Sequence, residues 1–176
     1  PGGSLELIGK HLITDHFFIA GPGRLIMSEG SHLAPQGARA PFWIQPGATV
    51  VMLQDSRIGV ESTAMDHACI PVLVGGTLMI GTPQRPITRD MLFPLAGMQD
   101  DKISRSPGES MRASGVSLLV GKAGRIEVHS ADPAKARVIF QMHDSQAARD
   151  HGSKWGEPKG IVLDFAGQAD LDGVMF

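Results

Sequence analysis

The amino-acid sequence predicts an all-β protein made of short strands that recur along the chain, and two observations support this prediction. The first is a repeated segment in which a glycine turn precedes an alternating apolar run, as in VLVGGTLMIG at Val72–Gly81. Looser copies occur at Phe18–Met27 and Leu118–Val128. The second is the scarcity of helical patterns, because no stretch of 12 or more residues carries an apolar stripe at i, i+3, i+4 and i+7.

The spacing of the copies indicates stacked repeats. The apolar residue that follows each turn glycine marks the register of a copy, usually two places after the glycine. These register marks are Leu5, Leu25, Val50, Leu78, Ile126 and Leu171, with Val50 and Leu171 the poorer fits. Successive marks lie 20, 25, 28, 48 and 45 residues apart. A period of 20 to 28 residues is typical of solenoid proteins. The two longer intervals indicate either a degenerate repeat or an insertion.

The apolar segments themselves have the length and composition of strands. They are rich in Val, Ile, Leu and Met, and most end at Gly, Pro, Asp or Ser. The expected strands are LELIG, RLIM, TVVML, TLMIG, RIEV, ARVIFQM and GIVLDF. The best helical candidate, DSQAARDHGSKW, is too polar for more than one or two exposed turns.

Two all-β architectures fit these strands, and the parallel β-helix fits them better. In that solenoid, equivalent positions of successive coils stack about 4.8 Å apart, and the turns need glycine where backbones approach closely. The alternative is an antiparallel jelly roll or sandwich, which also has short strands and Gly/Pro turns. Hairpin dipeptides argue against the alternative, because Asp172-Gly173 is the sole Asn-Gly or Asp-Gly pair.

Length and composition limit the classes of protein. The 176 residues suit a single domain, 1–176, with a sizeable core, and the net charge of −2 gives no sign of nucleic-acid binding. A single cysteine, Cys69, excludes an internal disulfide and is expected to be a buried apolar residue. No apolar run is long enough for a transmembrane helix, so no membrane insertion is expected. Because the last residues are apolar and strand-like, we expect the domain to be part of a longer chain.

The stretch 42–97 resembles the eight-glycine domain of cell-surface hyaluronidases and related extracellular proteins. The resemblance rests on a Pro-Gly turn before a TVVML strand and on the motif GGTLMIGTPQRP. The tail GIVLDFAGQADLDGVMF is similar to one coil of bacterial polysaccharide-active right-handed parallel β-helix proteins. The resemblance implies a right-handed β-helix, an extracellular or cell-surface location and a polysaccharide partner. Residues 99–114 and 144–159 depart from the family pattern, so no catalytic residue is carried over.

The densest group of polar residues, His143 to Lys159, is the first candidate binding site. Polysaccharide sites combine an aromatic ring that stacks on the sugar with charged or amide groups at its rim. A β-elimination lyase would need a base and a cation, which His151, Lys154 or Arg149 could supply. The alternative interpretation of this segment is a solvated surface loop. The candidate binding residues of this segment are His143, Asp144, Arg149, His151, Lys154 and Trp155.

A second candidate site lies in GTPQRPITRD, where Arg85 and Arg89 could hold the carboxylate of an acidic sugar in bidentate fashion. The alternative is a surface ion pair between arginine and aspartate. Trp43 is expected to pack in the core, with a sugar platform as the alternative interpretation.

Further acidic groups give weaker signals for metal or base chemistry. Asp66 and His67 form either a capped turn or a metal or base site. Calcium is a candidate ligand because aspartate pairs offer oxygen donors, although their spacing matches no defined calcium loop and no metal ligands are assigned. These pairs are Asp100 with Asp101 and Asp170 with Asp172.

The sequence supports three hypotheses about function. The first is a carbohydrate-binding or scaffold module of an extracellular polysaccharide-processing protein, because strong catalytic motifs are lacking. The second is a polysaccharide lyase or glycoside hydrolase; a hydrolase would draw two carboxylates from Glu127, Asp144, Asp150 and Glu157. The third is a structural surface assembly or fibre, in which exposed ends are capped by another copy or by the rest of a longer chain.

Overall fold

The structure is a computed structural model that describes residues 2–13, 17–35, 42–58, 72–95, 118–142, 163–165, 168–169 and 174–175. In these ranges the protein is all-β and contains no helix. None of the described segments could therefore cross a membrane as an apolar helix. The strands are β1 Ser4–Leu7, β2 Lys10–Ile13, β3 Phe17–Ile19, β4 Arg24–Met27, β5 His32–Pro35, β6 Phe42–Ile44, β7 Thr49–Met52, β8 Arg57–Ile58, β9 Val72–Val74, β10 Thr77–Ile80, β11 Met91–Leu95, β12 Leu118–Val120, β13 Arg125–Val128, β14 Val138–Met142, β15 Leu163–Phe165, β16 Gln168–Ala169 and β17 Val174–Met175.

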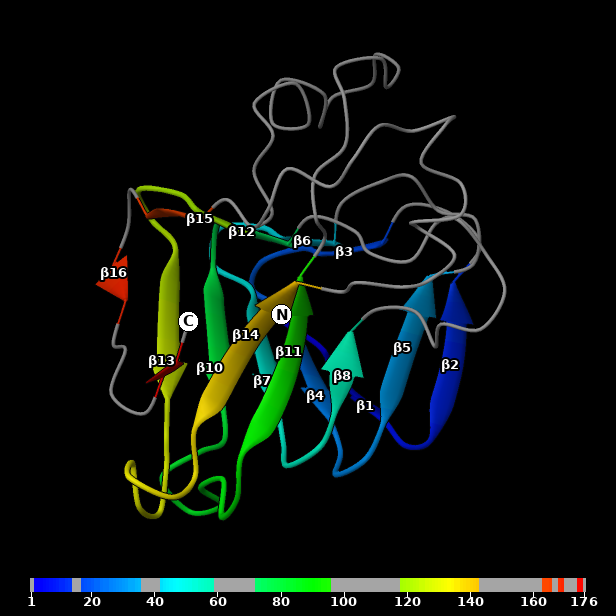
Figure 1. The fold of residues 1–176 in the computed structure, drawn as a ribbon. Helices are drawn as coiled ribbons and strands as arrows, with labels where there is room; N and C mark the ends of the chain where they lie inside the picture. The colour runs from blue at the N-terminus through cyan, green and yellow to red at the C-terminus, as the bar shows by residue number, and fades with distance from the viewer. Residues whose placement is uncertain are drawn as a thin grey trace, which may run out of the picture.

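The strands form four sheets whose order follows a step of three along the chain (Figure 1). The six-stranded sheet has the order β1-β4-β7-β10-β13-β16, and the five-stranded sheet has the order β15-β12-β9-β6-β3. The remaining strands form two three-stranded sheets, β2-β5-β8 and β11-β14-β17. Each of these strands follows a strand of the six-stranded sheet in the chain. One repeat is therefore a strand of the six-stranded sheet, one of a three-stranded sheet and one of the five-stranded sheet.

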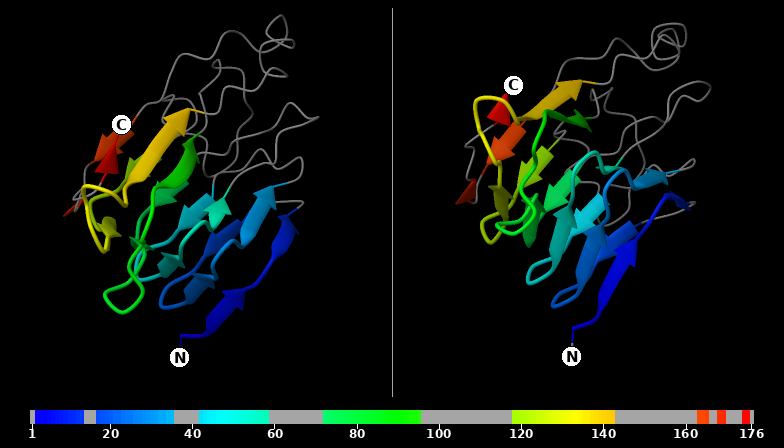
Figure 2. Two further views of the ribbon diagram at one scale, coloured as in Figure 1. Left: turned by 60° about the horizontal axis from the view of Figure 1, so that its bottom comes forward. Right: turned by 90° about the horizontal axis from the view of Figure 1, so that it is seen from below.

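All strand pairs in the described ranges are parallel. The repeats are stacked in the order of the chain, from the blue N-terminal end to the red C-terminal end (Figure 2). The predicted all-β class is confirmed. The antiparallel jelly roll or sandwich is wrong for these strands, because each returns to lie beside its equivalent in the preceding repeat.

The predicted register marks lie beside one another in the six-stranded sheet. Leu5 pairs with Leu25, Leu25 with Val50, Val50 with Leu78, and Leu78 with Ile126. Val50 keeps the register although it lies three residues after Gly47, because Ala48 occupies the turn position that Gly23 holds one repeat earlier. Both of these residues donate their N–H to the carbonyl three residues before, at 3.0 and 2.8 Å.

The last register mark is wrong, because Ile126 pairs with Ala169 and not with Leu171. Ala169 lies two places after Gly167, as the pattern requires, but alanine gives a weak apolar signal. The long interval between Leu78 and Ile126 is an insertion and not a degenerate repeat, since β10 and β13 are direct neighbours. The same holds between β13 and β16.

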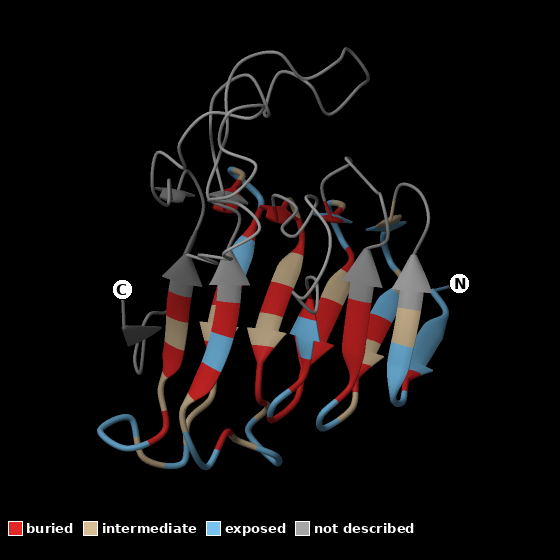
Figure 3. Ribbon diagram, turned by 45° about the vertical axis from the view of Figure 1, so that its right-hand side comes forward, coloured by how far each residue is buried: buried red, intermediate tan, exposed pale blue. Residues whose placement is uncertain are grey.

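The core lies between the sheets and is built mainly from alternate residues of the strands (Figure 3), while β7 and β9 also bury consecutive residues. In β4, β10 and β13 the second and fourth residues are buried while the first and third face outward. Leu25, Val50, Leu78 and Ile126 form one apolar ladder that is fully buried. Leu5 occupies the same inward position in β1 but is 55% exposed, because β1 is the edge strand of its sheet.

Glycines let the turns between the five-stranded and six-stranded sheets approach each other. A Cβ on Gly76 would lie 2.2 Å from the Ala48 carbonyl oxygen, and a Cβ on Gly124 would lie 2.0 Å from that of Val74. Both distances are far below van der Waals contact, so only glycine fits without a backbone shift. Gly76 and Gly124, two of the turn glycines in the sequence pattern, are thus required by the stacking of one turn on the next.

We predict that Gly124→Ala lowers the free energy of unfolding by about 1–3 kcal/mol, the usual cost of forcing extra atoms into a packed site. Gly121→Ala is the matched control in the same turn, because its Cβ would meet the Val74 oxygen at an ordinary 3.7 Å. The control should change stability by no more than about 0.5 kcal/mol. Urea unfolding of the two variants measures the difference, and equal stabilities would contradict the stacking constraint.

Candidate functional site

Arg85 and Arg89, the predicted sugar-binding arginines, lie in the segment that connects β10 to β11. Each makes an ion pair with a turn of an earlier repeat. Arg85 Nη2 lies 3.2 Å from Glu29 Oε1, and Arg89 Nη2 contacts Asp55 Oδ2. The four side chains are largely exposed, so each pair contributes little to stability. The structure shows arginine–carboxylate pairs here, while binding of a sugar carboxylate by these arginines stays a prediction.

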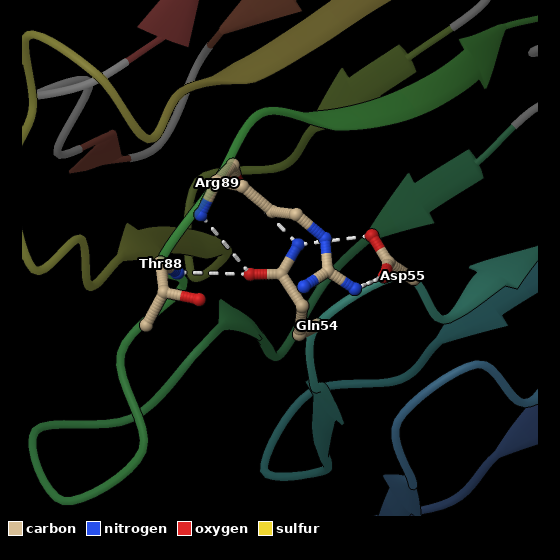
Figure 4. A network of polar contacts seen from close by, with 4 residues as sticks. All are labelled: Gln54, Asp55, Thr88 and Arg89. Carbon is tan, nitrogen blue, oxygen red and sulfur yellow. Dashed lines mark hydrogen bonds and ion pairs between the residues drawn. The ribbon is translucent and has the colours of Figure 1, made fainter.

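Gln54 holds the same segment through its side-chain amide (Figure 4). Its Oε1 accepts the N–H of Thr88 at 2.8 Å and that of Arg89 at 3.4 Å. Its Nε2 donates to Asp55 Oδ1 at 3.0 Å and to the Arg89 carbonyl at 3.3 Å. Because Gln54 is 9% exposed, these bonds replace water at a buried polar group. The amide therefore fixes the β10–β11 connection against the turn after β7.

Asp90 and Arg137 form an ion pair between equivalent positions, just before β11 and just before β14. Asp90 Oδ1 accepts the backbone N–H of Arg137 at 3.0 Å and its Nε at 3.1 Å, and Oδ2 accepts Nη2 at 2.6 Å. The side-chain hydrogen bonds from Arg137 lower the pKa of Asp90, with smaller backbone and charge effects in the same direction. The contact also raises the pKa of Arg137. This pair joins two repeats and has no feature of a ligand site.

A group of ionisable side chains lies on the outer face of the six-stranded sheet, on and just after β13. Glu127 Oε1 lies 2.8 Å from Arg125 Nε, and its Oε2 lies 3.4 Å from His129 Nε2. Glu127 is the single member of the predicted hydrolase carboxylates that falls within the described ranges. Together with His129 and Arg125, Glu127 places a carboxylate, an imidazole and a guanidinium side by side. A hydrolase would need a second carboxylate facing it.

Two aromatic side chains lie exposed on the outer face of the five-stranded sheet. Phe18 in β3 pairs in register with Trp43 in β6, and their exposed fractions are 54% and 37%. The prediction that Trp43 packs in the core is wrong. Its neighbours Phe42 and Ile44 are fully buried, and alternation along the three-residue strand turns Trp43 outward. Phe17, beside Phe18, instead stacks on Phe42 with ring centroids 5.4 Å apart.

Phe18 was not predicted as a site residue, although the sequence contains a signal for it. Phe18 and Trp43 are 25 residues apart, the same interval that separates the register marks Leu25 and Val50. Extending the repeat from the six-stranded to the five-stranded sheet would have placed the two rings side by side. An exposed aromatic pair in register is more informative than a single tryptophan, because two neighbouring strands both present a ring to solvent.

Most of the other predicted site residues lie outside the described ranges. The whole segment 143–162 follows β14, and residues 59–71 and 96–117 follow β8 and β11. The predicted residues concerned are His143, Asp144, Arg149, His151, Lys154, Trp155, Asp66, His67, Cys69, Asp100, Asp101, Asp170 and Asp172. Their roles stay predictions. In the part of the chain that is described, no three His, Cys, Asp or Glu side chains gather as a metal site would require.

Comparison with protein families gives one match, in which the model of the G8 domain covers residues 36–140, more than half of the chain. The chain belongs to the G8 domain family. The match contains the whole of the stretch 42–97, where the sequence resembles the eight-glycine domain. No significant match was found among curated proteins or among solved structures. G8 domains are typically found in extracellular or secreted proteins.

The G8 match includes the turn glycines, the Gln54 network and Trp43, whereas Phe18 precedes it. The family glycines thus correspond to close approaches between repeats, as at Gly76 and Gly124. They define the scaffold of this G8 domain. The candidate recognition surface is the aromatic pair on the outer face of the five-stranded sheet.

We predict that Gln54→Met destabilises this G8 domain by about 1–3 kcal/mol, because the N–H of Thr88 then loses its buried acceptor. Arg89→Met is the matched control, since it removes only an exposed ion pair and should cost at most about 1 kcal/mol. Urea unfolding at neutral pH measures both. If the two variants lost the same stability, the amide would not be what holds the β10–β11 connection.

We predict that the Asp90–Arg137 pair makes stability depend on pH in the acidic range. Because the folded-state pKa of Asp90 is lowered, its contribution is complete above the unfolded-state value of about 3.9 and is lost as pH falls through the folded value. The difference in unfolding free energy between the wild type and Asp90→Asn should therefore shrink as pH is lowered from 6 to 3. A difference that stayed constant over this range would contradict the assignment, and Arg137→Ala should abolish the pH-dependent part.

Proposed function

We propose that this G8 domain is a carbohydrate-binding module of an extracellular protein that processes polysaccharides. The observation that carries the proposal is the pair of exposed aromatic rings, Phe18 and Trp43, on neighbouring parallel strands. Aromatic rings bury apolar area at little entropic cost and suit the apolar face of a sugar ring. The family match supports the extracellular location.

The scaffold proposed for this module is a right-handed parallel β-helix. Its support is that the chain visits the same kinds of sheet in the same order in each repeat, and that each strand pairs in parallel with its equivalent one repeat away. Right-handed connections are the rule for parallel strands joined by crossovers. Such a scaffold presents equivalent outward positions as straight rows, which suits a polymeric ligand.

A polar group accompanies the rings at the same surface. Gln45 follows Trp43 by two residues and is half-buried, so alternation along the extended chain directs its side chain toward the same face. Its backbone N–H donates to the Ile19 carbonyl at 2.9 Å, which fixes the residue beside β3. An amide can donate to and accept from sugar hydroxyls. Two rings and an amide together form the minimum of a sugar-binding platform.

The remaining predicted ligand contacts are part of the same proposal. Arg85, Arg89, Arg149 and Lys154 would add charged contacts to an acidic polysaccharide. The other residues predicted in the segment, His143, Asp144, His151 and Trp155, would add hydrogen bonds to sugar hydroxyls or a further stacking ring. The proposed partners are thus the polysaccharide and either the rest of a longer chain or further copies of this domain. The exposed inward side chain of Leu5 on the edge strand β1 supports contact with another β segment.

We predict that Trp43→Ala weakens glycan binding by roughly tenfold or more, because the loss of one stacking ring costs on the order of 1.4 kcal/mol. A glycan array identifies the ligand, and calorimetry with the best ligand measures the change. Leu92→Ala is the matched control, since Leu92 is an exposed apolar residue at an outward position of another sheet. It should leave binding unchanged.

Two outcomes would contradict the proposal. One is the absence of binding to any glycan on the array by the folded wild-type protein. The other is an equal loss of affinity in Trp43→Ala and Leu92→Ala, which would indicate a general effect on folding. Trp155→Ala in the same assay separates the aromatic pair from the predicted site at 143–159.

A further inference from the structure

The outward row of the five-stranded sheet changes from exposed to buried within three strands. Phe18, Trp43 and Leu73 occupy successive register positions on β3, β6 and β9. Their exposed fractions fall from 54% to 37% and then to 3%. The row therefore offers two accessible rings and is closed on the side of Leu73. On the other side, β3 is the edge strand among the described residues.

The exposed area of the two rings matches that of a small, ring-shaped ligand group. Phe and Trp side chains each bury about 150–250 Å² when fully covered, so the exposed parts of these two rings amount to roughly 200 Å². A stable protein interface needs about 800 Å² on each partner. The two rings alone are thus too small for a second copy of the chain, whereas one or two sugar rings would cover them.

The spacing of the two strands that carry the rings suits consecutive units of a polymer. Neighbouring strands in a sheet are about 4.8 Å apart, which is close to the advance per sugar in an extended pyranose chain. Side chains at paired positions of parallel strands project from the same face of the sheet, so the two aromatic rings can support two sugar rings in one line. A ligand chain in this line runs across the strands, from one repeat to the next.

We propose that Phe18 and Trp43 are two adjacent subsites for consecutive sugars of an extended, ribbon-like polysaccharide that lies across the strands. This inference rests on the proposed function and adds the class of ligand and its direction. Equatorial β-linkages keep successive pyranose rings nearly in one plane, so both can stack on one flat surface. Helical α-1,4-linked chains turn successive rings out of plane and cannot contact both side chains equally.

The test compares ligands of increasing length by calorimetry on the full chain. The probes are glucose, cellobiose and cellohexaose, the chito-oligosaccharides of the same lengths, and maltose and maltohexaose as the α-linked counterparts. In at least one β-linked series the disaccharide should bind the wild type at least tenfold more tightly than the monosaccharide. Lengthening to the hexasaccharide should add less than this first step, because the row is closed at Leu73. The α-linked disaccharide should gain less than threefold over its monosaccharide.

Variants then assign the subsites. In Phe18→Ala and in Trp43→Ala the tenfold gain from mono- to disaccharide should disappear, while Leu92→Ala should retain it. Circular dichroism and thermal unfolding show whether each variant is folded; Phe18→Tyr and Trp43→Phe, which keep a ring, should restore the gain and guard against loss by misfolding.

The outcomes separate this inference from the proposed function. Equal affinity for mono- and disaccharide, with binding abolished by Trp43→Ala, would overturn the two-subsite inference and leave carbohydrate binding intact. Equal gains for α- and β-linked disaccharides would overturn the ribbon-like class alone. Absence of binding to all the glycans of this panel would overturn the inference; absence on the glycan array as well would overturn the proposed function.

Discussion

The structure depends on one steric constraint, the close approach of each turn to the turn of the preceding repeat. Parallel strands pair only if equivalent residues of successive repeats lie one strand spacing apart. At the corner between the five-stranded and six-stranded sheets, a side chain at Gly21, Gly76 or Gly124 would overlap a carbonyl oxygen of the neighbouring repeat. Glycine at these three positions therefore allows the strands on both sides to remain in register, whereas the turn before β7 holds Ala48 at the position of Gly76 and Gly124.

Once the register is fixed, the division between core and surface follows from alternation along each strand. The inward ladder of Leu25, Val50, Leu78 and Ile126 is fully buried because every member has an equivalent residue on each of the two neighbouring strands. The outward rows have no such requirement, so their composition is free to vary. The polar contacts between repeats, such as Gln54 with Thr88 and Asp90 with Arg137, lie in the connections that lead from the six-stranded sheet to the three-stranded sheets. There they hold the longer connections together with Gly81, whose Cβ would lie 2.5 Å from the His129 carbonyl oxygen of the next repeat.

The sequence predicted the scaffold well because the scaffold is a local pattern repeated. Turn glycine and apolar alternation gave the correct register for five strands from Leu5 to Ile126. It failed at Leu171, where Ala169 carries too little apolar signal, and at Trp43, whose large ring suggested burial. The partners of Arg85 and Arg89 could not be predicted, because Glu29 and Asp55 lie in other repeats, 56 and 34 residues away. Ion pairs between repeats depend on the lengths of the turns, which the apolar pattern does not encode.

An aromatic pair on an outward row is informative because the scaffold does not require aromatic residues there. A phenylalanine or tryptophan at an inward position needs no explanation, as the stack of the half-buried Phe17 on the fully buried Phe42 shows. Phe18 and Trp43 adjoin that stack in sequence but point the other way, so the core gains nothing from their rings. Two neighbouring repeats thus carry an aromatic ring at a position where the fold requires only a residue that tolerates an extended backbone. Exposed aromatic surface opposes solubility unless something covers it, and a sugar ring can do so reversibly while its hydroxyls remain in water.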